Sequence, residues 1–302
     1  MAEVQSQIRE ELLQFDSEFL RRLEYLNVVA RKIFAGLIRA DRQSIKRGTS
    51  AEFADHRPYV PGDDFRHVDW HLFGRLEELF LKLYREEENL HMTILLDCSQ
   101  SMDFGRTHKL SYALQVTAAL AYIGMANMDS VNVLPFQERL QEGLWNLKGR
   151  GKIFPLFEFL KELNGGGETS FPTSFREFIS RERRRGIVVV ISDFYDRQGF
   201  QPGLKFLRFP RHDIYVIHVV DRLEMEPDLR GELRLVDSEN QEHQEITITD
   251  GMLRRYKEAF GQLTEEVEAF CIRNEMGYVK ALTEIPFDQL VLKILRRGGL
   301  VG

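Results

Sequence analysis

MTILLDCSQS, residues 92–101, joins a short apolar run to a cluster of oxygen-bearing side chains. A run rich in leucine and β-branched residues that ends abruptly in polar residues is typical of a buried strand ending at the edge of a sheet. Asp97, Ser99 and Ser101 stand at alternate positions, which would place one carboxylate and two hydroxyls on one side of a tight loop. Hard oxygen ligands of this kind suit Mg²⁺ or Mn²⁺ better than zinc or copper. The stretch therefore predicts a buried strand that leads into a metal site.

Length and composition limit the class of protein around this stretch. A chain of 302 residues can form one large domain, or one domain with an appended piece. Its hydrophobic content of 43% is that of a globular protein rather than a disordered or membrane one. Lys and Arg together number 41 and Asp and Glu 47, and the resulting net charge of −6 does not favour a nucleic-acid partner.

Cysteine usage and the first residues indicate where the protein works. The two cysteines, Cys98 and Cys271, do not form a disulfide framework and fit a reducing compartment. The start MAEVQSQIREELL has charges where a signal peptide would need its apolar core. No run approaches the roughly 20 apolar residues that span a bilayer. The sequence thus predicts a cytoplasmic protein without a membrane span.

The first zone, residues 1–47, is predicted to be a helical segment. Apolar residues recur there at the spacings of three and four that mark one face of a helix: Ile8, Leu12, Phe15, Phe19, Leu23 and Leu26. Basic residues follow toward the expected end of the helix near Gly48, where the helix dipole favours them. A solvated face is therefore preferred over membrane or nucleic-acid contact.

The second zone, residues 48–90, is dense in charges and turn residues and is predicted to be a small extension of strand and loop. PGDD at 61–64 is a turn signal, and residues 79–84 have the pattern of a strand. Its candidate functional residues are Arg57, Tyr59, Asp63, Asp64, Arg66, Asp69, Trp70 and Arg75. They form either a partner surface or an internal clamp of ion pairs that fixes the zone on the sheet, and the bidentate pairing of Arg with carboxylates favours the clamp.

The third zone, residues 91–302, alternates strands and helices, as a parallel sheet with helical crossovers requires. Further strands are predicted over 131–136, 187–191, 214–220 and 278–282, and a hairpin over 233–249 that turns at 237–241. Helices are predicted over 110–125, 153–160, 175–179, 252–270 and 287–295, with a glycine-rich loop at 164–169. Asp97 and Asp193 then lie at the carboxyl ends of apolar strands, where ligands collect in an open parallel sheet.

Two motifs carry a resemblance to known families. RPYVPGDDFRHVDWHLFGR at 57–75, followed by a strand, an acidic run and ILLDCSQSM, resembles the bacterial domain of unknown function 58 family across about residues 48–105. That family carries R-x-Y-x-P-G-D-D-x-R-x-x-D-W before D-x-S-x-S-M. The D-x-S-x-S after an apolar strand also resembles the metal-ion-dependent adhesion site (MIDAS) of von Willebrand factor A domains. The resemblance implies an α/β, von Willebrand factor A-like (Rossmann-like) domain whose central, mostly parallel sheet is flanked by helices.

The resemblance also implies a ligand set. In such domains two serines of D-x-S-x-S, a threonine from a second loop and an aspartate from a third hold the metal, and the first aspartate helps directly or through water. The matching positions are Asp97, Ser99, Ser101, Thr169 and Asp193, with Mg²⁺ or Mn²⁺ as the ion. One departure is Glu168, which stands between Gly167 and Thr169 where relatives have G-G-T. Glu168 would then add a carboxylate that lies outside the ligand set or competes with it, and Ser170 or Thr173 are less favoured substitutes for Thr169.

The function implied by the resemblance is a non-enzymatic module that binds an acidic residue of another protein through the metal. The implied partner is a MoxR-type AAA+ ATPase or its substrate, in a chaperone-like assembly. Two alternatives remain open. One is a metal-dependent phosphohydrolase that uses Asp97 and Asp193, with Asp103, Glu168 or Asp196 as the base. The other is a metal-free scaffold in which the Arg and Asp residues of the second zone bind the partner.

Other patterns predict less. His67 and His71 are four residues apart but lack the H-E-x-x-H glutamate, so satisfied polar residues are preferred over metal ligands. Cys98 and Arg106 are eight residues apart, which does not match a C-x₅-R phosphate cradle. Ser99 lacks a G-x-S-x-G elbow, which disfavours a serine nucleophile.

Overall fold

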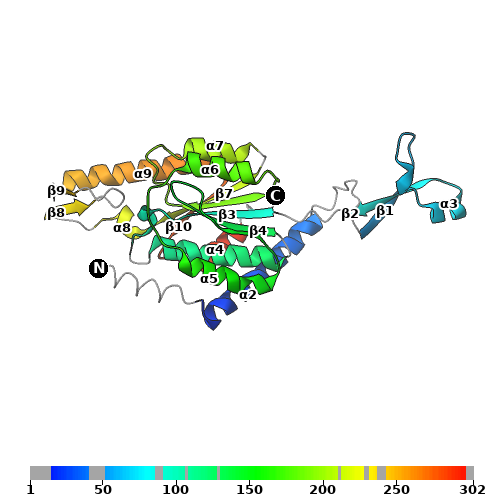
Figure 1. The fold of residues 1–302 in the computed structure, drawn as a ribbon, viewed down its shortest axis with the longest axis horizontal. Coiled ribbons are helices and arrows are strands. Elements are labelled where there is room, and N and C mark those ends of the chain that lie inside the picture. The colour runs from blue at the N-terminus through cyan, green and yellow to red at the C-terminus, as the bar shows by residue number, and fades with distance from the viewer. Residues whose placement is uncertain are drawn as a thin grey trace. The chain divides into compact units, whose positions relative to one another are not determined.

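The computed structural model describes residues 15–40, 52–85, 91–105, 108–127, 130–209, 212–227, 231–236 and 243–296. The chain divides into two compact units (Figure 1). The larger holds the chain up to Ile33 together with the chain from Leu90 onward, and the smaller is Phe34–Asn89. The boundary at Leu90 lies next to residue 91, where the sequence predicts the sheet domain to begin.

The larger unit is built around a six-stranded sheet. The spatial order of its strands is β10 (Gly277–Leu282), β7 (Asp213–Val220), β6 (Ile187–Ser192), β3 (His91–Asp97), β4 (Ser130–Phe136) and β5 (Leu144–Leu147). All neighbours are parallel except β4 and β5. Numbered along the chain, the order is 3-2-1-4-5-6, the doubly wound arrangement of two halves that diverge from the centre. The predicted α/β fold class with a mostly parallel sheet is confirmed.

Helices cover both faces of this sheet (Figure 1). One layer contains α6 (Phe171–Arg181), α7 (Gln201–Arg208) and α9 (Asp250–Arg273). The other contains α2 (Ser17–Ala40), α4 (Lys109–Ala126), α5 (Ile153–Glu162) and α10 (Phe287–Arg296). The short α8 (Arg222–Met225) follows β7, and β8 (Gly231–Val236) and β9 (His243–Ile248) form the predicted antiparallel hairpin. Its predicted turn falls outside the described residues. Within the described ranges, no helix combines the length and apolar character needed to cross a membrane.

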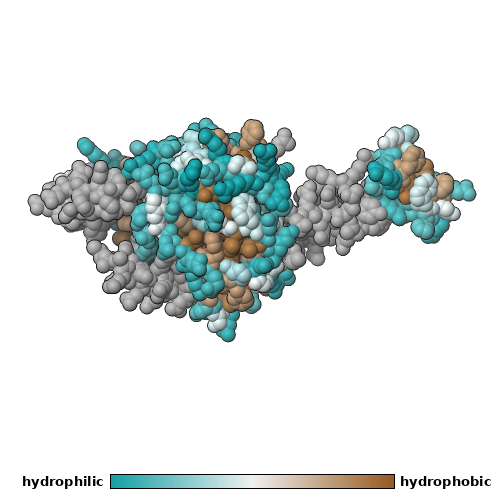
Figure 2. All heavy atoms as spheres, viewed as in Figure 1, coloured by the Kyte–Doolittle hydropathy of each residue, from teal (hydrophilic) through white to brown (hydrophobic). Residues whose placement is uncertain are grey.

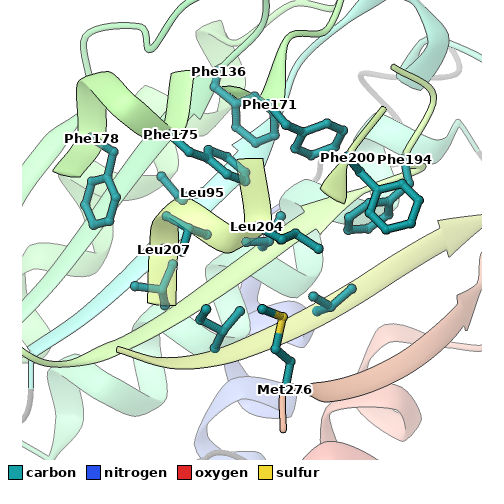
Figure 3. Packing of buried hydrophobic residues seen from close by; sticks show 14 of the residues in the cluster. Leu95, Phe136, Phe171, Phe175, Phe178, Phe194, Phe200, Leu204, Leu207 and Met276 are labelled. Carbon is teal, nitrogen blue, oxygen red and sulfur yellow. The ribbon is translucent and has the colours of Figure 1, made fainter. Parts of the chain in front are cut away.

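The central strands are mostly apolar and almost entirely buried because both faces of the sheet are covered. Every residue of β4 and β6 is buried, and so is β3 from Met92 onward. Figure 3 shows the core on the α6 and α7 side, where phenylalanine rings from four segments pack together. The ring of Phe171 lies 5.6 Å from Phe136, 5.3 Å from Phe175 and 5.2 Å from Phe194, measured between centroids. This core holds the segment after Thr169 against the sheet.

The N-terminal helix packs on the larger unit. The structure describes α2 as Ser17–Ala40, so the ends of the predicted helix, before residue 15 and after residue 40, lie outside the described residues. The predicted apolar face is buried at Phe19, Leu23 and Leu26. The ring of Phe19 lies 5.8 Å from that of Phe157 on α5 and 4.9 Å from that of Phe287 on α10. This face therefore extends the hydrophobic core.

The smaller unit is a hairpin with a helical insertion. Strand β1 (Glu52–Pro58) pairs antiparallel with β2 (Phe80–Arg85), and the connection contains the 3₁₀ turn Phe65–His67 and α3 (Trp70–Leu76). The sequence predicts the second strand and the turn, but neither β1 nor α3. Hydrophobic side chains lie at the surface of this unit (Figure 2), among them Val60, Phe65, Trp70, Phe73 and Leu76.

The candidate clamp residues pair with one another inside this unit. The Arg57 Nη2 donates to Asp63 Oδ1 at 2.7 Å, and Arg66 Nη2 donates to Asp64 Oδ2 at 2.6 Å. The ring of Tyr59 stacks on that of Phe65, and the ring of Trp70 meets that of Phe73 edge-on. The Arg75 side chain is exposed. Arg57–Asp63 and Arg66–Asp64 are thus ion pairs within the smaller unit, and the role of the whole set in fixing this zone on the sheet stays a prediction.

Asp69 is the most connected of these residues. Its Oδ2 lies 2.9 Å from His56 Nε2 and 3.4 Å from Lys82 Nζ, and its Oδ1 accepts hydrogen bonds from the backbone N–H groups of His71 and Leu72. The carboxylate thereby caps α3 and ties it to both strands. The His56 hydrogen bond, with the backbone donors and the Lys82 charge, lowers the pKa of Asp69 from 3.8 to about 2.

We expect Asp69→Asn to destabilise the smaller unit at pH 7 and to have no effect near pH 2. The folded-state pKa lies below the unfolded value, so the folded state binds fewer protons. This stabilisation is present above about pH 4 and is lost as the pH falls towards 2. Urea unfolding in a Trp145→Phe background isolates the fluorescence of Trp70, because the chain has 2 tryptophans. Glu78→Gln, at an exposed site of the same unit, is the control. An Asp69→Asn effect that persists unchanged at pH 2 would contradict this account.

Candidate functional site

The candidate site lies where the doubly wound sheet changes direction. Strands β3 and β6 are neighbours in space, yet the chain leaves them toward opposite sides of the sheet. Connecting loops diverge at such a switch point and leave a crevice outside the carboxyl ends of the strands, where ligands bind in folds of this class. Asp97 ends β3, and Ser192 ends β6 with Asp193 directly after it. The topology therefore brings these residues to one edge of the sheet.

Asp97 is the centre of a buried hydrogen-bond cluster. Its Oδ1 accepts a hydrogen bond from the backbone N–H of Ser99 at 2.9 Å, and its Oδ2 accepts one from the Ser192 hydroxyl at 2.6 Å. The Thr169 Oγ1 lies 3.4 Å from both carboxylate oxygens. All four residues are buried. The predicted threonine is thus brought to the predicted first aspartate.

Backbone hydrogen bonds hold the two loops together. The N–H of Gln100 donates to the carbonyl of Gly167 at 3.0 Å, and the N–H of Gly166 donates to the carbonyl of Cys98 at 2.9 Å. Within the D-x-S-x-S loop the hydroxyls of Ser99 and Ser101 lie 3.1 Å apart. The glycine-rich loop therefore serves to bring its backbone against D-x-S-x-S, and this is how Thr169 reaches Asp97.

Asp193 lies at the same edge but has different partners. Its Oδ2 accepts a hydrogen bond from Lys109 Nζ at 2.7 Å, and its Oδ1 accepts one from the backbone N–H of Tyr195 at 3.2 Å. Lys109 also donates to the Glu224 carboxylate. Neither Lys109 nor Asp193 is accessible to solvent beyond 1%. The Asp193 side chain is therefore held by an internal cation.

Negative charge exceeds positive charge among the described residues of this edge. Asp97, Asp193, Asp221 and Glu224 are buried carboxyl groups, and Lys109 is the ammonium among them. Burial, together with the charge of Asp193, raises the pKa of Asp97 well above its usual value, although the hydrogen bonds from Ser192 and Ser99 oppose the shift. Burial likewise raises the pKa of Glu224. Such shifts mark buried carboxylates that lack sufficient positive charge, and perturbed groups of this kind cluster at functional sites.

The family of the chain follows from its sequence match. The model of the family described as protein of unknown function DUF58 matches residues 55–266. The chain belongs to the DUF58 family. Uncharacterized proteins of Mycobacterium bovis and Mycobacterium tuberculosis are each 24% identical to it over 239 residues, or 77% of this chain and 75% of the relative. The DUF58 resemblance predicted from the sequence is confirmed.

Solved structures with some likeness to this DUF58 chain include two bacterial proteins. The conserved hypothetical protein BatB from Bacteroides thetaiotaomicron is 12% identical, with a TM-score of 0.42 over 68% of this chain and 98% of that chain. An aerotolerance-related membrane protein from Bacteroides fragilis is 14% identical, with a TM-score of 0.41 over 69% of this chain and 99% of that chain. The manganese-loaded TRAP protein of Plasmodium vivax is 16% identical, with a TM-score of 0.34 over 43% of this chain and 57% of that chain.

Sequence reasoning missed three residues of the DUF58 site, namely Ser192, Lys109 and Glu224. Ser192 had a signal, because it directly precedes Asp193 at the end of an apolar strand. The sequence signal for Lys109 was weaker, because Lys109 is only a single charged residue at the start of a mostly apolar helix. Asp221 and Glu224 have the spacing of a capping box. The pairing of Glu224 with Lys109, across 115 residues, has no local signal.

The substitutes and alternative bases named from the sequence have other partners. The Ser170 and Thr173 hydroxyls bond to each other at 2.9 Å. The exposed Glu168 lies 3.6 Å from Arg197 Nη1. Asp103 Oδ1 lies 3.1 Å from His108 Nδ1, and Asp196 accepts the N–H groups of Phe171 and Gln198. In the described part of the chain no three His, Cys, Asp or Glu side chains come together to hold a metal ion, so a cation here would depend on the hydroxyls.

We expect Ser192→Ala to lower the free energy of unfolding by about 1–3 kcal/mol, because a buried carboxylate loses its closest donor. The hydroxyl also accepts the N–H of Phe194, which is left without this partner. Losing the donor raises the pKa of Asp97 further, so the cost should be larger at pH 8 than at pH 5. Chemical denaturation in EDTA at both pH values measures this, with the exposed Ser180→Ala as control. Equal effects of the two substitutions would contradict the proposed role of Ser192.

Proposed function

We propose that this DUF58 protein is a non-enzymatic interaction module that binds an acidic residue of a partner protein through a divalent cation. The cation would be Mg²⁺ or Mn²⁺, held by Asp97, Ser99, Ser101, Thr169 and Asp193. The observation that carries the proposal is a cluster of buried carboxyl groups, more numerous than the buried ammonium groups beside them, next to converging hydroxyls at the switch point of the sheet. A divalent cation would stabilise the charged form of these carboxyl groups, whereas without one the raised pKa of Asp97 favours its protonated, neutral form.

Two features of the described geometry support the proposal of such an ion. Magnesium prefers six oxygen ligands at about 2.0–2.1 Å in octahedral positions, which puts neighbouring ligands about 3.0 Å apart. The Ser99 and Ser101 hydroxyls are 3.1 Å apart, so they suit two adjacent positions. The Thr169 hydroxyl, next to Asp97, adds a third neutral oxygen. Because hydroxyls neutralise little of the ion's charge, the ion would still attract a further carboxylate from outside.

The partner's carboxylate would supply the remaining ligand. The resemblance to DUF58 and von Willebrand factor A domains extends the proposal to a MoxR-type AAA+ ATPase, or its substrate, as that partner. The phosphohydrolase alternative needs a base beside the ion. Asp103, Glu168 and Asp196, the three carboxylates named for that role, contact His108, Arg197 and backbone N–H groups respectively. The binding role requires no such base.

Metal binding should stabilise the fold. With the free ion at a hundredfold excess over its Kd, we expect about 2.7 kcal/mol of added stability, seen as a rise in Tm. Asp97→Asn should abolish the rise. Asp213→Asn, at the exposed start of β7, should leave it unchanged. If neither Mg²⁺ nor Mn²⁺ at millimolar levels shifts the Tm of the unaltered protein, the metal-free scaffold becomes the better account.

Partner capture is tested by equilibrium binding of a candidate MoxR-type ATPase, with and without EDTA. We expect EDTA and Asp97→Ala each to weaken binding strongly. In a second set of measurements, Arg57→Ala in the smaller unit should leave ATPase binding unchanged if the partner is held through the metal. The metal-bridged interaction would be contradicted if the affinity for the ATPase is unchanged by EDTA and by Asp97→Ala but is weakened by Arg57→Ala.

A further inference from the structure

We propose that Lys109 is a positioning residue that competes with the divalent cation for Asp193, and that Glu224 is the second acceptor that keeps its ammonium in place. This inference rests on the metal site proposed above and identifies the residue that sets its affinity. It assigns a role to a buried pair that the proposed ligand set does not include.

The ammonium of Lys109 is an internal cation within reach of the site. Lys109 is the first residue of α4, and its side chain is inaccessible to solvent. Its Nζ donates to Asp193 Oδ2 at 2.7 Å and to the Glu224 carboxylate. The rings of Phe104 and Tyr195 lie 5.6 Å and 5.3 Å from it, measured to their centroids, so aromatic rings complete the enclosure. Because water does not reach this ammonium, its field on the neighbouring site is weakly screened.

Glu224 is itself held firmly. Its Oε2 accepts the N–H of Asp221 at 3.0 Å within the capping box of α8. Asp221 in turn accepts the Thr283 hydroxyl at 2.7 Å, which anchors this segment to the end of β10. Lys109 can therefore release Asp193 and still retain a buried carboxylate as partner. A lysine bound by Asp193 alone would have no such second position.

Competition follows from the way the Asp193 oxygens are used. Oδ2 faces the ammonium and Oδ1 accepts the N–H of Tyr195, so both oxygens already have a donor. An incoming cation at Oδ2 would have to share this oxygen with Lys109 or displace the ammonium, and at Oδ1 it would bind the same carboxylate whose charge Lys109 already partly neutralises. A positive charge within a few ångströms of a dication also repels it directly. Both effects weaken metal binding relative to a site with an unpaired Asp193.

The decisive variant is Lys109→Met combined with Glu224→Gln. The pair removes one positive and one negative charge, so the net charge of the chain is unchanged and a general field effect is avoided. Isothermal titration with Mn²⁺ should show binding roughly tenfold tighter than in the unaltered protein, a modest effect for removing one charge so near a dication. Adding Asp193→Asn to this background should abolish the gain. Unaltered protein and Asp97→Asn, titrated in parallel, test the metal site itself.

The outcomes separate the two proposals. Normal binding by the unaltered protein with unchanged or weaker binding by the double variant would overturn the role of Lys109 and leave the metal site standing. No binding by the unaltered protein, but Asp97-dependent binding by the double variant, would support the role of Lys109 and refute the metal site in its native form. Absence of binding in both would overturn both.

A single variant covers the case in which the double variant does not fold. Glu224→Gln leaves Lys109 with Asp193 as its remaining carboxylate partner, so Mn²⁺ binding should weaken roughly tenfold. Circular dichroism and Tm establish that the variant is folded. Unchanged Mn²⁺ affinity in folded Glu224→Gln would overturn the inference.

Discussion

Replacing Phe171 by alanine should lower the free energy of unfolding by about 3–5 kcal/mol. The ring is completely buried and lies among the rings of Phe136, Phe175 and Phe194, shown together in Figure 3. Gly203 of α7 approaches so closely that a Cβ there would lie 2.4 Å from the Phe171 Cβ, so the helix backbone is already in contact. The surroundings have little room to collapse into the cavity, which keeps the cost near the upper end of the range.

The matched control is Phe209→Ala. That ring is 89% exposed, so its removal should change stability by no more than about 0.5 kcal/mol. Urea denaturation of both variants in EDTA measures the difference. Because Thr169 is two residues before Phe171, the Phe171 variant should also lose part of its metal-induced rise in Tm. If Phe171→Ala lowers the free energy of unfolding by no more than Phe209→Ala does, the aromatic core does not hold the segment after Thr169 in place.

Lys109→Met alone should cost about 3–5 kcal/mol at pH 7, the range found when one partner of a buried ion pair is removed. The substitution leaves Asp193 and Glu224 buried without the ammonium that both contact. Adding Glu224→Gln should recover part of the lost stability, because one of the two carboxylates left without an ammonium partner is then replaced by a neutral amide. A double variant as unstable as Lys109→Met would contradict the coupling.

Lys257→Met on α9 is the control for Lys109→Met, since Lys257 is exposed and should tolerate the change. Thermal and urea unfolding of the unaltered protein, Lys109→Met, Glu224→Gln and the double variant form a double-mutant cycle, and Lys257→Met is measured alongside. If Lys109→Met costs no more than Lys257→Met, the buried ion pair does not stabilise this edge of the sheet.

The sheet could be predicted because its signals are local. The runs that form β3 and β6 are apolar throughout and end in polar residues, and alternation of strands with helices fixes a parallel sheet. Parallel strands place their carboxyl ends on one edge, and the crossover helix α6 that leads into β6 begins at that same edge, so the approach of Thr169 to Asp97 also follows from the order of elements. The metal-ligand roles of these residues remain a prediction.

Short elements with mixed signals were not predicted. Helix α7 begins Gln-Pro-Gly, and glycine in a helix of eight residues favours the prediction of a loop. Helix α3 has seven residues inside a charge-dense zone, where no apolar period can develop. The Lys109–Glu224 contact depends on tertiary packing of α4 against the segment after β7. No sequence pattern within either segment predicts that packing.

The most direct measurement is anomalous X-ray diffraction from a crystal of this protein soaked in Mn²⁺. We expect a strong anomalous peak within ligand distance, about 2.2 Å for manganese, of the Ser99 and Ser101 hydroxyls, on the side facing Thr169 and Asp97. The same crystal treated with EDTA should lose the peak. If these residues are well ordered at saturating Mn²⁺ but no peak appears, or the peak lies away from the two hydroxyls, the proposed divalent-cation site is contradicted.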